Sequence, residues 1–375
     1  MPSSALSLKI LLSSLKFVTD LYKALAPQFR NLIQTKSDRF LNYDPGFLLD
    51  SYAAEQSVAN GITYTRICDL LKLAPAAESW DDQIVDITVI AEPFARSNGS
   101  AQWQKASSAG YTALLESGRI GANESTVRVS DASGAGGRAK LTLQRGTYHD
   151  QAHSNLVLDF DRDNPNRYVP LRAQLHNKYP ERLPALSDRR LANGLGVASL
   201  LFYRSNGQWT PYIVRRVKKL GVFPGGLHCT ASGVAKWPVD PGVKTLANFA
   251  TDHMLSEIEE EVGLTPADLV DFRPIALCRE MARGGKPQLF YAGFTLLDRD
   301  VLADRRKEAT RVIEATNQWP EIERDRWFRS ADVVNTPSKL RARIGRWGLT
   351  LEGAAAFHFG REYARVQLPH LNIPK

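Results

Sequence analysis

The segment from Thr245 to Phe272 carries seven acidic residues and no lysine or arginine. The spacing of its apolar residues predicts a helix over about 245–262, with Gly263 as a left-handed cap. On a helical wheel, three of its carboxylates fall within one arc beside the apolar stripe. They belong to Glu257, Glu260 and Glu261.

These three carboxylates point to a bound metal ion. Like charges three or four residues apart destabilise a helix by about 0.2–0.5 kcal/mol per pair, unless a cation compensates them. Because the segment contains no lysine or arginine, a bound cation is the simplest compensator. A ligand set made only of oxygen suits a hard ion, Mg²⁺ or Mn²⁺, that keeps waters and bridges to substrate phosphates. A solvated acidic face on a surface helix is the alternative that composition leaves open.

The residues around this helix resemble a known motif. They follow the pattern Gly242-x5-Asn248-x7-Ser256-Glu257-Ile258-x-Glu260-Glu261-x-Gly263-Leu264. This pattern resembles the Nudix box, which reads Gly, five residues, Glu, seven residues, Arg-Glu, apolar, x, Glu-Glu, x, Gly, apolar. Seven of its nine specified positions fit, while Asn248 and Ser256 replace the glutamate and the arginine. The resemblance covers about residues 190–370 and includes the Phe-Pro-Gly-Gly turn at 223–226, which an insertion of 16 residues separates from the box.

The resemblance implies a C-terminal Nudix-like α/β/α sandwich with a mixed sheet. It also implies metal-dependent hydrolysis of the diphosphate bond of a nucleoside diphosphate linked to another group. In such chemistry the cation neutralises the diphosphate oxygens and the leaving group, and a carboxylate or metal-bound water supplies the attacking hydroxide. By similarity, Glu257, Glu260 and Glu261 are catalytic residues and metal ligands, and one of them, or another carboxylate, is also the base. In the family, the arginine that Ser256 replaces orients these glutamates.

Further candidates for substrate binding are Arg215, Arg216, Gly225, Gly226 and Glu280. The two arginines can hold phosphate through charge-assisted hydrogen bonds, with surface solubility as the alternative. The two glycines belong to the turn before the box. Glu280 is a weaker candidate, because an ion pair with Arg279 or Arg283 is the favoured interpretation.

Two other functions stay open. Asn248 and Ser256 favour a catalytically silent Nudix-fold nucleotide-binding sensor or regulator, whereas the three glutamates favour hydrolysis. Residues 159–220 hold twelve Lys and Arg against five Asp and Glu, which raises the alternative of a nucleic-acid-binding protein. Because that segment contains no recognisable RNA or DNA module, a nucleotide diphosphate derivative is the favoured partner over a nucleic acid. A homodimer is left open.

The elements that must position these residues indicate an α+β protein in three parts. We expect an amphipathic helical segment over 1–40, with a helix at 5–34, then a separate α+β domain of unknown role over 41–185 and the Nudix-like domain over 186–375. In the second part, strands separated by turns rich in Gly, Ser and Asn are predicted at 84–90, 126–129, 140–143 and 156–160, with a hairpin turn at 131–138.

The third part is predicted to begin with a strand at 196–203, a turn at 205–207 and a hairpin partner at 212–217. A second hairpin joins strands around 274–280 and 288–294. The remainder is mostly helical and carries three tryptophans, for which core packing is favoured over stacking on a nucleobase. They are Trp319, Trp327 and Trp347.

Four histidines have alternative interpretations. His149 and His153 have a spacing that suits zinc on a helix, but a polar turn in a loop is favoured. His228 and Cys229 follow the glycine turn, where an ordinary loop is favoured over a place in the pocket. His253 lies four residues before Glu257 and could orient it, with a solvent-facing side chain as an equal alternative.

Composition excludes several classes of protein. The 375 residues are 43% hydrophobic and 23% charged, which is typical of a globular chain and excludes collagen, coiled coil and wholesale disorder. No apolar run is long enough for a transmembrane helix. The three cysteines are too few and too scattered for a disulfide framework, so we expect a reducing, cytoplasmic setting.

Overall fold

The computed structural model describes residues 39–55, 62–70, 85–135, 138–164, 166–205, 208–217, 223, 225–237, 250–315 and 349–370. Several sequence-based predictions lie outside these ranges and are neither confirmed nor contradicted. They concern the helix at 5–34, the box residues Gly242 and Asn248, and the tryptophans Trp319, Trp327 and Trp347.

In the described part of the chain, six strands form a mixed sheet. Its strands are β1 (Tyr64–Asp69), β10 (Leu269–Glu280), β11 (Lys286–Thr295), β5 (Gly196–Ser205) and β6 (Gln208–Pro211), in that order across the sheet, and β9 (Ala231–Val234), which also pairs with β5. β11 runs parallel to β5, while the other pairs are antiparallel. The predicted mixed sheet and the hairpin of β10 with β11 are therefore confirmed, and both of its strands are longer than predicted.

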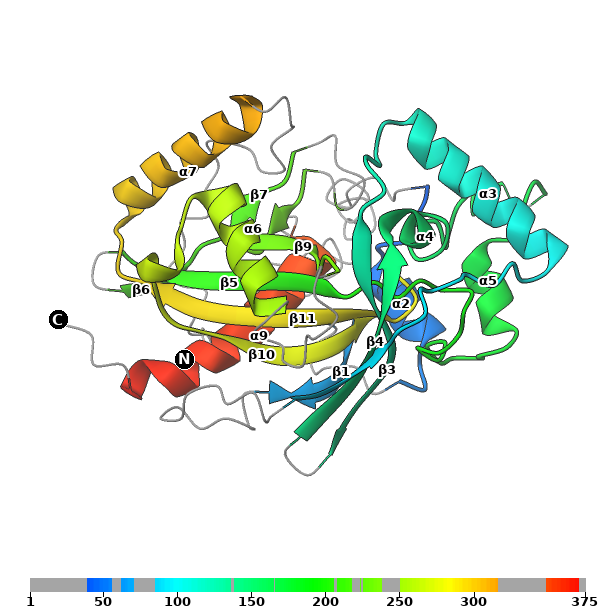
Figure 1. The fold of residues 1–375 in the computed structure, drawn as a ribbon, viewed down its shortest axis with the longest axis horizontal. Helices are drawn as coiled ribbons and strands as arrows, with labels where there is room; N and C mark the ends of the chain where they lie inside the picture. The colour runs from blue at the N-terminus through cyan, green and yellow to red at the C-terminus, as the bar shows by residue number, and fades with distance from the viewer. Residues whose placement is uncertain are drawn as a thin grey trace, which may run out of the picture.

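Helices cover both faces of this sheet (Figure 1). α6 (Asp252–Val262) and α7 (Arg299–Ala315) pack on one face, and α9 (Leu351–Gln367) packs on the other. Alternate residues of the central strands supply the two cores: Leu289 and Tyr291 face α6, whereas Phe290 and Ala292 face α9. Every residue of β11 is buried, as expected for a strand with helices on both sides.

A smaller sheet lies beside the larger one. It contains β2 (Val85–Ile90), β4 (Arg138–Thr147) and β3 (Ser125–Ala135), in that order. Four helices lie on one side of this sheet (Figure 1). They are α2 (Pro45–Ser51), α3 (Ala101–Glu116), α4 (Tyr148–Ala152) and α5 (Leu171–His176). β3 and β4 form the predicted hairpin, but residues 131–135, which were predicted as turn, belong to β3 and pair with 138–142.

Contacts cross the predicted boundary at residue 185. β1 lies before this boundary, yet it pairs with β10 as an edge strand of the larger sheet. From β3, Val127 N–H donates to Ala235 O at 2.8 Å, and Leu195 N–H donates to Val127 O at 2.7 Å. The two sheets share one apolar cluster. The division into domains stays a prediction, and the described elements on either side of the boundary share a core.

Three local predictions are wrong. The hairpin partner of β5 is β6, not 212–217, and β7 (Val214–Arg215) pairs instead with β8 (Leu227–His228). Residues 156–160 form buried turns and no strand. Their apolar side chains pack in the same cluster as residues of α3, and a run that is buried on all sides does not alternate between apolar and polar residues. The predicted loop at His149 is the short helix α4, capped by Thr147 and Asp150.

None of the helices in the described ranges has the length and apolar composition needed to cross a bilayer. Two 3₁₀ turns, Pro266–Asp268 and Leu368–His370, follow α6 and α9.

Candidate functional site

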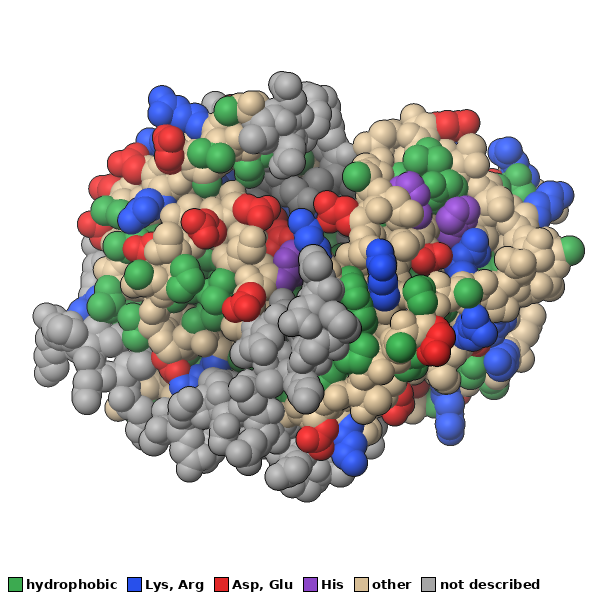
Figure 2. Space-filling view, viewed as in Figure 1, with side chains coloured by type: hydrophobic (Ala, Val, Ile, Leu, Met, Phe, Trp, Pro, Cys, Tyr) green, Lys and Arg blue, Asp and Glu red, His purple; other side chains and the backbone are tan. Residues whose placement is uncertain are grey.

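α6 forms within the predicted range 245–262, of which 245–249 lie outside the described residues, and its glutamates range from exposed Glu260 to buried Glu261. Met254, Ile258 and Val262 are fully buried against the sheet. Gly263 ends the helix at φ +72°, in the left-handed region that favours glycine, and its N–H donates to Glu259 O at 3.0 Å. The predicted cap is thus confirmed, and acidic side chains gather over this helix on the molecular surface (Figure 2).

Glu257 lies against β9. This strand precedes α6 in the chain and pairs with β5 in the sheet. A Cβ atom added to Gly233 would lie 2.5 Å from Glu257 Oε1, so only glycine leaves room for this carboxylate. His253 Nε2 lies 3.1 Å from the same oxygen. The two side chains are therefore close, but the geometry is not that of a hydrogen bond, and the orienting role of His253 stays a prediction. Glu257 is held between a strand and a histidine while 17% of its side chain stays exposed.

Glu260 is exposed to solvent and has a different neighbour. Ser256 Oγ donates a hydrogen bond of 2.9 Å to Glu260 Oε1, one helical turn away. Ser256 stands where the Nudix box has an arginine. In this chain the hydroxyl contacts one of the glutamates, although it brings no charge to them.

Glu261 is the most buried of the three, at 9% exposure. Ser232 N–H, on β9, donates to Glu261 Oε2 at 3.3 Å. Ser232 Oγ in turn accepts hydrogen bonds from Arg216 Nη1 at 3.2 Å and contacts His228 Nε2 at 2.9 Å. Glu261 thus begins a chain of buried polar contacts that runs from α6 through β9 to the interior.

The three glutamates fit a hard ion by chemistry, since all their donors are oxygen. Among the residues that the structure describes, however, only His228, Cys229 and Glu352 place three ligand atoms within 4.8 Å of one another. The glutamates share one face of α6 without meeting at one point. Mg²⁺ usually binds one or two carboxylates and keeps several waters, so their spread agrees with such an ion. Their role as ligands stays a prediction.

The two predicted phosphate-binding arginines are directed toward the protein. Arg215 Nη1 donates to Gly225 O at 2.6 Å, and Arg216, with only 8% exposure, reaches Ser232. Gly225 has φ +71°, and Gly226 O accepts from Arg216 N–H at 2.9 Å. These contacts shape the turn before β8. Substrate binding by these four residues stays a prediction.

Glu280 belongs to a buried charged cluster at the β10–β11 turn. Its side chain pairs with Arg283, which also donates to Glu352 Oε2 at 2.9 Å, and Gln288 Nε2 donates to Glu352 Oε1 at 3.0 Å. The ion pair of Glu280 with Arg283 is therefore confirmed, but it is fully buried rather than at a strand edge. Lys286 completes the cluster, with Nζ 3.2 Å from Gln288 Oε1.

Burial and mutual repulsion shift the proton affinities in this cluster. Burial, followed by repulsion from Arg283, lowers the pKa of Lys286 to about 7. Burial and the nearby Glu352 raise the pKa of Glu280. Burial opposes the charge of Arg283, but the carboxylates of Glu280 and Glu352 outweigh it and raise its pKa. A buried pair with one partner removed would leave an uncompensated charge, so these residues depend on each other.

His228 and Cys229 lie inside the protein, not in a surface loop. The ring nitrogens of His228 contact Thr350 Oγ1 at 2.6 Å and Ser232 Oγ at 2.9 Å. Burial, and then the charges of Arg216 and Arg283, lower the pKa of His228 well below its usual value, so the ring is neutral. Burial, and then the carboxylates of Glu352 and Glu261, raise the pKa of Cys229.

Sequence reasoning missed Ser232, Gly233, Thr350 and Glu352. The first two follow His228 by four and five residues, where the turn before the box could have drawn attention to them. Nothing in the sequence links Thr350 and Glu352 to this region, because more than a hundred residues separate them from His228.

His149 and His153 form no metal site with a third ligand in the described ranges. Tyr111 stacks on the ring of His153, with centroids 3.7 Å apart, and its hydroxyl contacts His149 Nδ1 at 3.0 Å. His149 lies in α4 and His153 is its C-cap residue, so the favoured interpretation of a polar turn in a loop is wrong. The structure has a cavity of about 510 Å³, and none of the predicted site residues lines it. Its lining is Ser97, Lys178, Tyr179, Ser187, Asp188, Arg189 and Arg190.

Neither a scan of protein-family models nor a search of curated proteins gives a match. Among solved structures, the chain is similar to the NUDIX domain of Shewanella oneidensis NrtR complexed with ADP ribose, at 16% identity and a TM-score of 0.26, over 45% of this chain and 86% of that one. It is similar to a mutT/nudix family protein from Listeria innocua, at 15% identity and a TM-score of 0.28. The match covers 48% of this chain and 98% of that one. It is also similar to a C. elegans Ap4A hydrolase in a binary complex, at 12% identity and a TM-score of 0.26. The match covers 48% of this chain and 99% of that one. TM-scores of this size carry no argument about activity, so the interpretation rests on α6 and its surroundings.

Proposed function

We propose that this chain is a Nudix-type hydrolase that cleaves the diphosphate bond of a nucleoside diphosphate linked to another group. The proposal rests on one face of α6. On this face Glu257, Glu260 and Glu261 lie beside a buried apolar stripe, and the helix ends at the Gly263 cap. This is the arrangement that the Nudix box resemblance requires of a metal-binding helix. No other set of carboxylates on a helix in the described ranges follows that pattern.

In this proposal the three glutamates hold Mg²⁺ or Mn²⁺, which would neutralise charge on the diphosphate. Gly233 leaves room for the Glu257 carboxylate, and His253 Nε2 lies 3.1 Å from it. Ser232 fixes Glu261 through its backbone N–H, and Ser256 fixes Glu260. Each carboxylate thus has a neighbour in this chain, and a bound ion would draw the three carboxylates closer together.

Turnover of a substrate panel tests the proposal. Nucleoside diphosphate sugars, dinucleotides, ADP-ribose and capped RNA are incubated with the full chain, with and without Mg²⁺ or Mn²⁺, and the nucleotide products are separated. We expect metal-dependent release from at least one class, and its loss in Glu260→Gln and Glu261→Gln. Turnover that is unaffected by either substitution would contradict the assignment.

The second candidate is a catalytically silent nucleotide-binding sensor with the same helix. It is favoured by Ser256, which supplies no positive charge to the glutamates. Absence of turnover with every substrate, together with a nucleotide-induced rise in the unfolding temperature, would support this function instead.

A further inference from the structure

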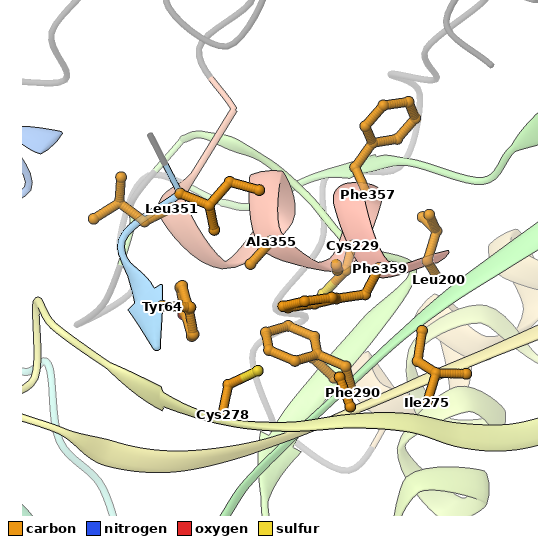
Figure 3. Packing of buried hydrophobic residues seen from close by; sticks show 14 of the residues in the cluster. Tyr64, Leu200, Cys229, Ile275, Cys278, Phe290, Leu351, Ala355, Phe357 and Phe359 are labelled. Carbon is orange, nitrogen blue, oxygen red and sulfur yellow. The ribbon is translucent and has the colours of Figure 1, made fainter. Parts of the chain in front are cut away.

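A buried group of potential metal ligands lies under α9, and Ser232 links it to Glu261 of α6. His228 is the last residue of β8, Cys229 follows it, and Glu352 lies in the first turn of α9. Their exposures are 2%, 0% and 5%, and their ligand atoms all lie within 4.8 Å of one another. Figure 3 shows Cys229 among apolar side chains between α9 and the sheet. A polar trio in such a core needs partners that offset its desolvation.

We propose that His228, Cys229 and Glu352 bind a transition-metal ion, and that Zn²⁺ is the ion this ligand set favours. Imidazole nitrogen, thiolate sulfur and carboxylate oxygen are the three ligand types of protein zinc, whereas Mg²⁺ does not bind sulfur. The proposal goes beyond the hydrolase function, because none of the three residues belongs to the glutamate face of α6. With three protein ligands, a zinc site keeps its fourth position for water or another group.

The spacing of the ligand atoms is close to that of a formed site. Zinc bonds of about 2.0–2.3 Å in a tetrahedron place neighbouring ligand atoms about 3.3–3.8 Å apart. From at most 4.8 Å, small side-chain rotations bring each pair to that separation. Cys229 Sγ, now 3.4 Å from Ala231 O, binds as the thiolate and its proton passes to solvent.

The neighbours of His228 suit metal binding. A zinc-bound histidine uses one ring nitrogen for the ion and donates from the other to an oxygen, which fixes the ring. His228 has a hydroxyl on each side, Thr350 Oγ1 at 2.6 Å and Ser232 Oγ at 2.9 Å. Whichever nitrogen takes the ion, the other keeps an oxygen partner.

The neighbours of Glu352 serve the same purpose. Arg283 and Gln288 each donate one hydrogen bond to a different carboxylate oxygen, at 2.9 and 3.0 Å. Every carboxylate oxygen has a further lone pair, so Glu352 can bind a metal while both donors stay in place. The cluster at the β10–β11 turn therefore holds the carboxylate where the ion needs it.

Cobalt binding to the full chain tests the proposal. The chain is freed of metal with a chelator and titrated with Co²⁺, and the thiolate-to-cobalt charge-transfer absorption is recorded. We expect a band that saturates with one Co²⁺ bound at the thiolate and disappears when Zn²⁺ is added. The band should be lost in Cys229→Ser and kept in Cys278→Ser, which removes an equally buried thiol from the same apolar cluster.

Absence of the band in the unaltered chain would overturn the proposal, and so would a band of equal intensity in Cys229→Ser. Circular dichroism shows whether each variant folds. If Cys229→Ser does not fold, X-ray absorption of the Zn²⁺-loaded unaltered chain decides: the proposal requires one sulfur together with nitrogen and oxygen ligands, and a shell without sulfur refutes it. Metal bound by the α6 glutamates gives no thiolate band, so the two sites are tested separately.

Discussion

Replacing Gly233 by alanine should displace Glu257 without unfolding the protein. The added Cβ would lie 2.5 Å from Glu257 Oε1 and 2.7 Å from its Cδ, where ordinary contact begins at 3.4 Å. The carboxylate must therefore move by about 0.9 Å, the difference between 3.4 and 2.5 Å. This move also breaks the 3.1 Å contact with His253 Nε2.

Gly233→Ala should weaken metal binding and leave the free energy of unfolding nearly unchanged. The atoms that Gly233→Ala meets are the far end of a flexible side chain, and alanine in a strand is favoured over glycine by about 0.5–1 kcal/mol. We therefore expect a free energy of unfolding within about 1 kcal/mol of the original. Displacing a group that orients a metal ligand typically weakens metal affinity by about 10- to 100-fold.

Calorimetric titration with Mn²⁺ measures this affinity, and urea unfolding measures the stability. Gly121→Ala is the matched control, because nothing lies within 4 Å of its added Cβ. It should change neither quantity. A Gly233→Ala variant that folds and binds Mn²⁺ as tightly as the original chain would refute the placement of Glu257 at the metal.

Three further predictions concern stability. Gly263→Ala should lower the free energy of unfolding by about 1–2 kcal/mol in urea, because φ is +72° and the added Cβ would lie 2.5 Å from Arg305 O; an unchanged value would contradict the cap. Asp159→Asn should lower it by about 3–5 kcal/mol, since Arg172, 2% exposed, would lose its 2.7 Å partner; a loss below about 1 kcal/mol would contradict this. Burial, then Arg96 and His149, lower the pKa of His153 to about 4. The unfolded chain therefore takes up a proton first, so stability should fall as the pH drops from about 6.5 to 4, and His153→Asn should flatten that slope.

Sequence patterns predicted the elements that are specified by residues close together in the chain. The three- and four-residue spacing around Ile258 and the glycine at 263 specify α6 and its end, because the helix repeat and the left-handed cap are properties of adjacent residues. The β10–β11 hairpin follows from two apolar runs with Gly284 and Gly285 between them, both at positive φ.

Such patterns did not predict contacts between residues far apart in the sequence. Nothing near Tyr64 in the sequence shows that β1 pairs with β10, and only folding brings Glu352 to His228. The apolar run at 156–160 is ambiguous because a fully buried turn and a buried strand have the same composition. The two arginines of the β7 region were expected at the surface, but Arg216 is buried by the contact with Ser232.

The account depends on a metal at the acidic face of α6, and an anomalous difference map from crystals soaked in Mn²⁺ and a nucleoside diphosphate sugar tests this most directly. We predict a manganese peak in contact with carboxylate oxygens of Glu257, Glu260 or Glu261 and with the diphosphate. A map without a peak on α6, from crystals in which the nucleotide is bound, would contradict the account.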